Sequence, residues 1–133
     1  MNRMIPSQSK VALLLVAIAV SGCSSDRTDD YIPDSTDART ALEIALNAWQ
    51  SGAPYEPITS SSPTLNVFDA RWQAGQKLER FEILEELPEK ERPEFKVKMQ
   101  LAGKPEETLT YIIIGIDPLQ IFRDADYQRA TGM

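Results

Sequence analysis

The sequence predicts an α+β fold, with one N-terminal amphipathic helix packed on a curved antiparallel sheet of four to five strands. Three observations predict it. Apolar residues recur at helical spacing between residues 38 and 49, apolar and polar residues alternate between residues 95 and 101, and clusters of turn residues separate the remaining apolar segments. A helix followed by a meander of strands is typical of an α+β domain.

The predicted helix begins near Asp37 and ends before Gly52. Thr36 or Asp37 can cap its first turn, and Gly52 can supply the left-handed residue that ends it. One face of this helix carries the apolar positions Ala38, Ala41, Leu42, Ala45, Leu46 and Trp49. Because such a face must be covered, we expect the helix to lie on the sheet.

The strands are expected after a loop rich in proline and serine over residues 53–63. A short strand covers Leu65–Phe68. The run DARWQAG, Asp69 to Gly75, has the capping residue and the glycine of a single helical turn, which brings Trp72 to the core. The longer strands correspond to the segments KLERFEILEEL, EFKVKMQLA, ETLTYIIIGI and LQIFRD. The charged turn PEKERP separates the first two of them.

The chain is expected to divide into four parts. Residues 1–22 are a signal peptide, 23–37 a lipidated cysteine and a flexible acidic tether, 38–124 a single folded domain and 125–133 a loose tail. Between residues 24 and 37, five aspartates accompany only Tyr31 and Ile32 as large apolar residues, too few to offset the entropy of ordering. The alternative is a Ca²⁺ loop, but the segment lacks the glycine and the terminal glutamate of an EF-hand; its ligands would be Asp26, Asp29, Asp30 and Asp34.

The N-terminal segment has the pattern of an export signal. Arg3 and Lys10 accompany the apolar run VALLLVAIAV, which covers Val11 to Val20. A permanent transmembrane helix needs about 20 apolar residues, so this shorter run predicts a segment that is removed after export. Cys23, the single cysteine of the chain, follows directly.

The run Val20-Ser21-Gly22-Cys23 resembles the lipobox of bacterial lipoproteins. The resemblance implies that the Cys23 thiol receives diacylglycerol, that the chain is cut before Cys23 and that the new amino group is usually acylated too. Two or more acyl chains hold a protein stably on a membrane without spanning it. Ser24 stands where aspartate would resemble an inner-membrane signal, which favours the outer membrane, facing the periplasm. The alternative is an ordinary secretory signal that leaves Cys23 as a free or disulfide-paired thiol.

The composition disfavours several classes of function. The net charge is −6, and loss of Arg3 and Lys10 with residues 1–22 changes it to −8, which argues against nucleic-acid binding. The chain has no histidine, and the resemblance commits Cys23 to lipid, so the usual ligands of Zn²⁺, copper and haem are missing. We therefore expect no metal, no cofactor and no Ser-His-Asp or Cys-His catalysis.

Asp69 and Asp117 are the candidates for a general base, since each lies at the end of an element beside a buried strand. The alternative roles are helix capping by Asp69 and turn formation by Asp117. The nearby Arg71 and Arg123 are expected to point outward. The structural roles are sufficient to account for both aspartates.

Three further groups have two interpretations each. Trp49 and Trp72 could stack a ligand, but their apolar surroundings favour core packing. The segment Ile112 to Ile116 could be an exposed edge that pairs with a partner, or a central strand covered by the helix. Six glutamates could hold an ion or act as acid and base, but Arg80, Lys90 and Arg92 among them favour a solvated hairpin; they are Glu82, Glu85, Glu86, Glu89, Glu91 and Glu94.

The order of elements, together with the run W-x-x-G-x-x-L-x-x-F-E-I from Trp72 to Ile83, resembles small envelope lipoproteins whose domains look like the cystatin or NTF2-like fold. The resemblance covers about residues 38–124. Cystatin protease inhibitors carry a Q-x-V-x-G hairpin that this sequence lacks, so protease inhibition is not implied. NTF2-like enzymes surround a deep pocket lined by Asp or His with several helices, whereas this chain has one main helix and no histidine.

These observations predict a lipid-anchored, non-enzymatic module that binds another protein or takes part in its assembly. One alternative is a small NTF2-like ligand pocket or carboxylate-dependent enzyme, and another is a passive structural lipoprotein. A deep closed cavity reached by Asp69 or Asp117 would favour the pocket. A filled core with an apolar exposed edge would favour the protein partner.

Overall fold

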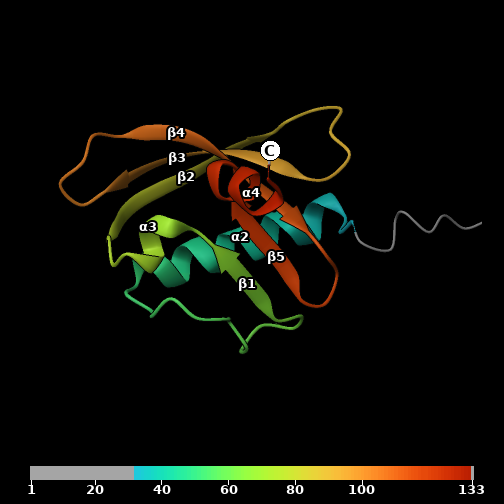
Figure 1. The fold of residues 1–133 in the computed structure, drawn as a ribbon, viewed down its shortest axis with the longest axis horizontal. Coiled ribbons are helices and arrows are strands. Elements are labelled where there is room, and N and C mark those ends of the chain that lie inside the picture. The colour runs from blue at the N-terminus through green and yellow to red at the C-terminus, as the bar shows by residue number, and fades with distance from the viewer. Residues whose placement is uncertain (1–31, 133) are drawn as a thin grey trace, which may run out of the picture.

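The structure, a computed structural model, describes residues 32–132 (Figure 1). The described helices are α2 (Ser35–Gln50), α3 (Ala70–Gln73) and α4 (Asp124–Thr131). The strands are β1 (Leu65–Phe68), β2 (Leu78–Glu86), β3 (Glu94–Leu101), β4 (Glu107–Ile114) and β5 (Leu119–Arg123). The predictions for residues 1–31, including Cys23 and most of the tether, lie outside the described residues.

The strands form one five-stranded sheet in the order β1-β5-β4-β3-β2. β2 to β5 are antiparallel neighbours, as the alternation and the turns predict. β1 instead pairs parallel to β5, with Leu65 opposite Leu119 and Phe68 opposite Phe122. The α+β class is confirmed, but the expectation of a wholly antiparallel sheet is wrong, because β1 meets β5 through a long connection instead of a hairpin.

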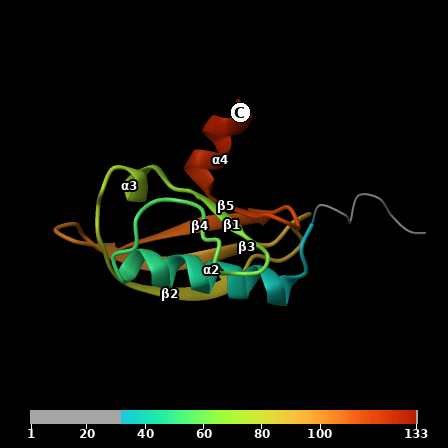
Figure 2. The same ribbon diagram turned by 90° about the horizontal axis from the view of Figure 1, so that it is seen from below.

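Helix α2 covers one face of the sheet and α4 stands on the other (Figure 2). The apolar stripe of α2 is fully buried against strands of the sheet. Trp49 and Trp72 pack face to face with their ring centroids 5.6 Å apart, and their indole N–H groups donate to the carbonyls of Gln76 and Ala53. Core packing of both tryptophans is therefore confirmed.

α2 begins earlier than the sequence predicts. Asp34 is its N-cap, and the Asp34 side chain accepts from the Asp37 amide at 2.9 Å. Residues 35–37, which the sequence analysis assigned to the tether, are therefore part of α2, because aspartate is a favoured N-cap residue. Asp34 has a sufficient role as a cap, whereas Asp26, Asp29 and Asp30 lie outside the described residues.

Residues 124–131 form helix α4, so the prediction of a loose tail from residue 125 is wrong. Tyr127 of α4 packs edge-on against Phe122 with ring centroids 5.4 Å apart, and the Arg92 guanidinium lies 4.9 Å from the Tyr127 ring centre. α4 thereby helps to bury Ile112 and Phe122 on the sheet face opposite α2. Packing against the sheet supplies the stability that a helix this short lacks alone.

β4 is a central strand, between β3 and β5. Tyr111 and Ile113 face α2 and are fully buried, which confirms the central placement of the isoleucine-rich segment. Ile116 lies beyond the strand, in the turn before β5, and is exposed. The edges of the sheet are β1 and β2.

Candidate functional site

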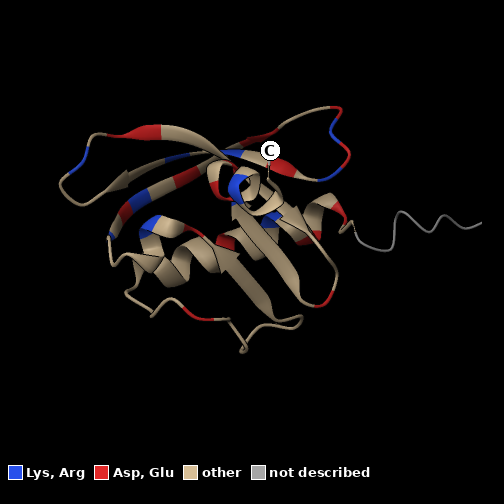
Figure 3. Ribbon diagram, in the orientation of Figure 1, with Lys and Arg blue, Asp and Glu red and all other residues tan. Residues whose placement is uncertain are grey.

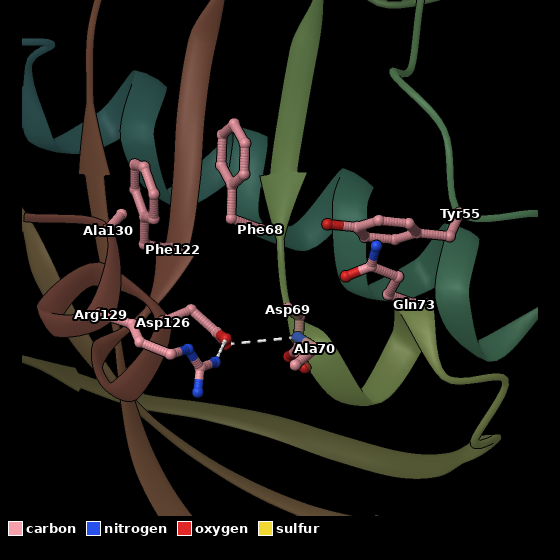
Figure 4. Close-up of a pocket in the computed structure, with 9 residues that line it drawn as sticks. All are labelled: Tyr55, Phe68, Asp69, Ala70, Gln73, Phe122, Asp126, Arg129 and Ala130. Carbon is pink, nitrogen blue, oxygen red and sulfur yellow. Dashed lines mark hydrogen bonds and ion pairs between the residues drawn. The ribbon is translucent and has the colours of Figure 1, made fainter.

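A concavity of about 500 Å³ opens on the α4 side of the molecule, where the end of β1 meets β5 and α4. Figure 4 shows Tyr55 and Gln73 on one side of it and Phe68 and Phe122 on the other. The floor is formed by Asp69 and Ala70. The complete lining is Tyr55, Phe68, Asp69, Ala70, Gln73, Phe122, Asp126, Arg129 and Ala130.

Asp69 is the sequence-predicted residue that lines this concavity, and it is only 1% exposed. It caps α3 through a hydrogen bond from the Arg71 amide at 2.9 Å, which confirms its capping role. Its other carboxylate oxygen accepts from the Tyr111 hydroxyl at 2.5 Å. Burial, followed by the charge and hydrogen bond of Asp69, raises the pKa of Tyr111 well above its ordinary value, while Arg71 acts in the opposite direction.

Arg71 points inward, contrary to the prediction from sequence. Its guanidinium lies between Asp69, at 3.4 Å, and Glu107, at 2.8 Å, and it donates to the Tyr111 hydroxyl at 3.4 Å. Burial alone would lower the pKa of Arg71, but the charges of Asp69, Tyr111 and Glu107 raise it. The buried Asp69 carboxylate attracts the guanidinium inward, because an unpaired buried charge costs several kcal/mol.

Asp126, on the first turn of α4, is a site residue that the sequence analysis missed. Its carboxylate accepts from the Ala70 amide at 3.3 Å and from Arg123 at 2.8 Å, and it pairs with Arg129. Arg123 therefore also turns back onto α4 and does not point outward. Burial alone would raise the pKa of Asp126, but the hydrogen bonds from Arg123 and Arg129 lower it below its ordinary value.

The aromatic walls of the concavity come from three segments that lie far apart in the sequence. Phe68 and Phe122 are stacked with ring centroids 4.5 Å apart, and Phe68 is 37% exposed. Tyr55 lies across from them, and burial raises the pKa of its phenol. A hydrogen bond with the Asp69 backbone lowers this pKa in part, whereas the charges of Asp69 and Asp126 raise it further. A neutral phenol and two phenyl rings make this surface apolar, with polar groups at its base.

Asp117 does not line the concavity. It is exposed in the turn between β4 and β5, in agreement with the turn-forming role. The structure thus does not bring the two candidate bases together.

The glutamates around the β2–β3 turn form the mixed-charge surface that the sequence favours. Glu82 pairs with Lys98 at 3.8 Å and Glu94 with Arg92 at 3.5 Å. Glu94 is nearly buried, so it is an exception to the solvated interpretation. Within residues 32–132 no group of three or more His, Cys, Asp or Glu side chains is arranged to hold a metal ion.

Both carboxylates that border the concavity accept hydrogen bonds from protein donors, which fix their positions. The exposed Phe68 ring offers apolar contact area beside them.

The sequence contained signals for helix α4, which the sequence analysis missed. They are Asp124 and Asp126 in its first turn, Arg129 in its last turn and Gly132 at its end.

Comparison with protein-family models, curated proteins and solved structures finds no match to this chain. Among the described helices, none is both long and apolar enough to cross a membrane.

Proposed function

We propose that this chain is a lipid-anchored protein of the bacterial cell envelope whose folded part binds another protein without catalysing a reaction. The observation that carries the binding part is Phe68, a large aromatic side chain 37% exposed beside an open concavity. Exposed apolar surface of this kind, rimmed by polar groups, is typical of protein interaction sites.

The anchoring part rests on the sequence. A basic start, the run VALLLVAIAV and Val20-Ser21-Gly22-Cys23 support acylation of Cys23. Ser24 supports the outer membrane, facing the periplasm. A helix across a five-stranded sheet supports kinship with the cystatin or NTF2-like folds, which belongs to the same proposal.

The anchor is tested by metabolic labelling with a radioactive fatty acid. We expect the chain to be labelled, and Cys23→Ser to be unlabelled and released from the membrane fraction. Ser24→Asp should be labelled as strongly as the natural chain but shift toward the inner membrane on a density gradient. A Cys23→Ser chain that still carries label would exclude the lipoprotein proposal.

The binding function is tested by photocrosslinking in the native envelope, with a benzoyl-phenylalanine placed in turn at the exposed apolar positions Ile44, Phe68, Leu84 and Ile116. We expect a discrete crosslinked protein at one of these positions, absent from the other positions. If none of the four positions crosslinks, a passive structural role replaces the binding function.

The second candidate is a ligand pocket or enzyme that uses Asp69, because this carboxylate borders the concavity. A panel of ester, glycoside and phosphoester substrates tests it, with Asp69→Asn as the variant and Asp117→Asn, in an exposed turn, as the control. Turnover that Asp69→Asn abolishes and Asp117→Asn preserves, at unchanged melting temperature, would favour the enzyme.

A further inference from the structure

The two edges of the sheet are built differently. β2 carries four glutamates, and its register with β3 shifts twice, between Leu78 and Arg80 and between Ile83 and Glu86. Charged residues and bulges are devices that prevent an edge from pairing with another chain. β1 has no charged residue, as Figure 3 shows.

On the outer edge of β1, the backbone of Leu65 is hydrogen-bonded to another segment, whereas within the described residues the backbone of Val67 is not. Leu65 exchanges both backbone hydrogen bonds with Ile58, at 2.8 and 3.1 Å. The Thr64 carbonyl accepts from the Leu119 amide of β5. Because backbone groups alternate in direction along a strand, the amide and carbonyl of Asn66 point toward β5 and those of Val67 point away from it. Among residues 32–132 the Val67 amide and carbonyl have no backbone partner on this side.

An apolar groove runs beside this unpaired stretch. A hollow of about 340 Å³ is lined by Tyr55, Glu56, Pro57, Asn66, Val67 and Phe68. It shares Tyr55 and Phe68 with the concavity described above, so the two hollows adjoin, and together they are called here the β1 groove.

The β1 groove has opposite charges at its two ends. Glu56 is exposed at the Pro57 end. At the α4 end the side chain of Arg129 is 63% exposed, and within residues 32–132 Asp126 is the one carboxylate that pairs with Arg123 and Arg129. A complementary segment therefore carries a basic residue toward Glu56, an apolar residue at Phe68 and an acidic residue toward Arg129.

We infer that the β1 groove binds an extended segment of a partner polypeptide, which adds as a strand beside Val67 and seats a large apolar side chain against Tyr55 and Phe68. The backbone of such a segment supplies the donor and acceptor that Val67 lacks, and its side chains match the groove in polarity. This inference rests on the proposed protein-binding function and names the surface and the class of partner.

The test measures binding of the fluorescently labelled peptide Lys-Val-Phe-Val-Asp, with blocked ends, to the full chain purified in detergent. We expect Val67→Pro and Phe68→Ser each to weaken binding about tenfold, as the loss of about 1.4 kcal/mol implies. Leu84→Ser, on the other edge, should stay within about twofold of the natural chain. Proline is tolerated at an edge position whose amide faces solvent, so Val67→Pro should fold.

A second readout does not depend on folding of a variant. The same peptide, N-methylated at each residue in turn, should lose affinity at the positions that bond to Val67 and keep it at those between. Binding that tolerates every N-methyl group and Val67→Pro, or no binding by the natural chain, would overturn strand addition. A dimer of the full chain that Val67→Pro dissociates would make a second copy the occupant and also overturn the inference.

The photocrosslinking experiment separates this inference from the proposed function. Crosslinks to a protein from position 68, with none from 84, agree with both. Crosslinks from 84 and none from 68 leave the binding function standing and overturn the β1 groove as its surface. Crosslinks from no position overturn both.

Discussion

At the scale of single residues, Asp69 shows how a buried carboxylate is supplied with hydrogen-bond donors. Three donors serve it: the Arg71 amide, the Arg71 guanidinium and the Tyr111 hydroxyl. Glu107 closes the network on the far side of Arg71. The network ties the β1–α3 connection to the central strand β4, so it positions the floor of the concavity.

Tyr111→Phe keeps the ring and removes the donor from Asp69. We expect the free energy of unfolding to fall by about 1–3 kcal/mol, because a buried carboxylate oxygen loses its partner. Tyr127→Phe is the matched control, since the Tyr127 ring packs on Phe122 and Arg92 and its hydroxyl makes no hydrogen bond within residues 32–132. Urea unfolding measures both, and equal losses would contradict a special role for the Tyr111 hydroxyl.

Asp126 makes part of the stability depend on pH. Its pKa is lower in the folded chain than in the unfolded chain, so it stabilises the fold above about pH 4 and this contribution is lost as the pH falls through the folded-state value. Asp126→Asn should therefore be less stable than the natural chain at pH 7 and lose less stability between pH 5 and about 3.

Urea unfolding at these pH values is the measurement. Asp117→Asn serves as the control, because Asp117 is exposed in a turn and this variant should follow the natural chain. Parallel curves for Asp126→Asn and the natural chain would show that the arginine pairs of Asp126 do not stabilise the fold.

At the scale of elements, the turn between β4 and β5 depends on one glycine. Gly115 has a φ of +86°, and a Cβ built there would lie 2.7 Å from the Pro118 carbonyl oxygen. Gly103, in the turn between β3 and β4, has a φ of +75° but open space around it. Both glycines therefore need a left-handed backbone, but only Gly115 also lacks room for a Cβ atom.

Gly115→Ala should consequently be more destabilising than Gly103→Ala. Both variants lose about 1–2 kcal/mol from the left-handed backbone, and Gly115→Ala loses about 1–3 kcal/mol more because backbone must move to admit the methyl group. Thermal unfolding monitored by circular dichroism compares them. A Gly103→Ala variant as unstable as Gly115→Ala would rule out the steric contribution.

At the scale of the whole molecule, β1 and α4 complete a fold whose remainder is a helix on a meander. β1 closes one edge of the sheet beside β5, and α4 covers Ile112 and Phe122 on the face that α2 leaves open. Both elements also form the candidate site. The site therefore lies where two parts of the chain that are distant in sequence meet.

The chain from Ile32 to Met133 should unfold cooperatively without residues 1–31. It contains the whole described core, and Asp34 still caps α2. A chain that begins at Asp37 should be less stable by about 0.5–2 kcal/mol, because the cap is lost. Calorimetry compares the two. A gradual, non-cooperative transition for residues 32–133 would show that the fold needs residues outside this range.

Local chemistry made the greater part of the fold predictable. The spacing of Ala38 to Trp49 defines the buried face of α2, and the alternation from Phe95 to Leu101 defines β3, because side chains repeat with the geometry of each element. Asp69 was recognisable as a cap because it precedes a short helical turn that ends in glycine. The helical end of the chain carried readable signals too, but a short polar helix is stable only if something covers it.

By itself the sequence determined the α+β class, the buried face of α2, the strand segments and the capping role of Asp69, since each depends on residues within a few positions of one another. Only the tertiary structure decided the parallel pairing of β1 with β5, the inward turn of Arg71 and Arg123, and the contact of Asp126 with Ala70. Asp126 and Ala70 lie 56 positions apart in the sequence. No periodicity in the chain encodes which distant donors meet a buried carboxylate, because that is settled by the free energy of the whole packed molecule.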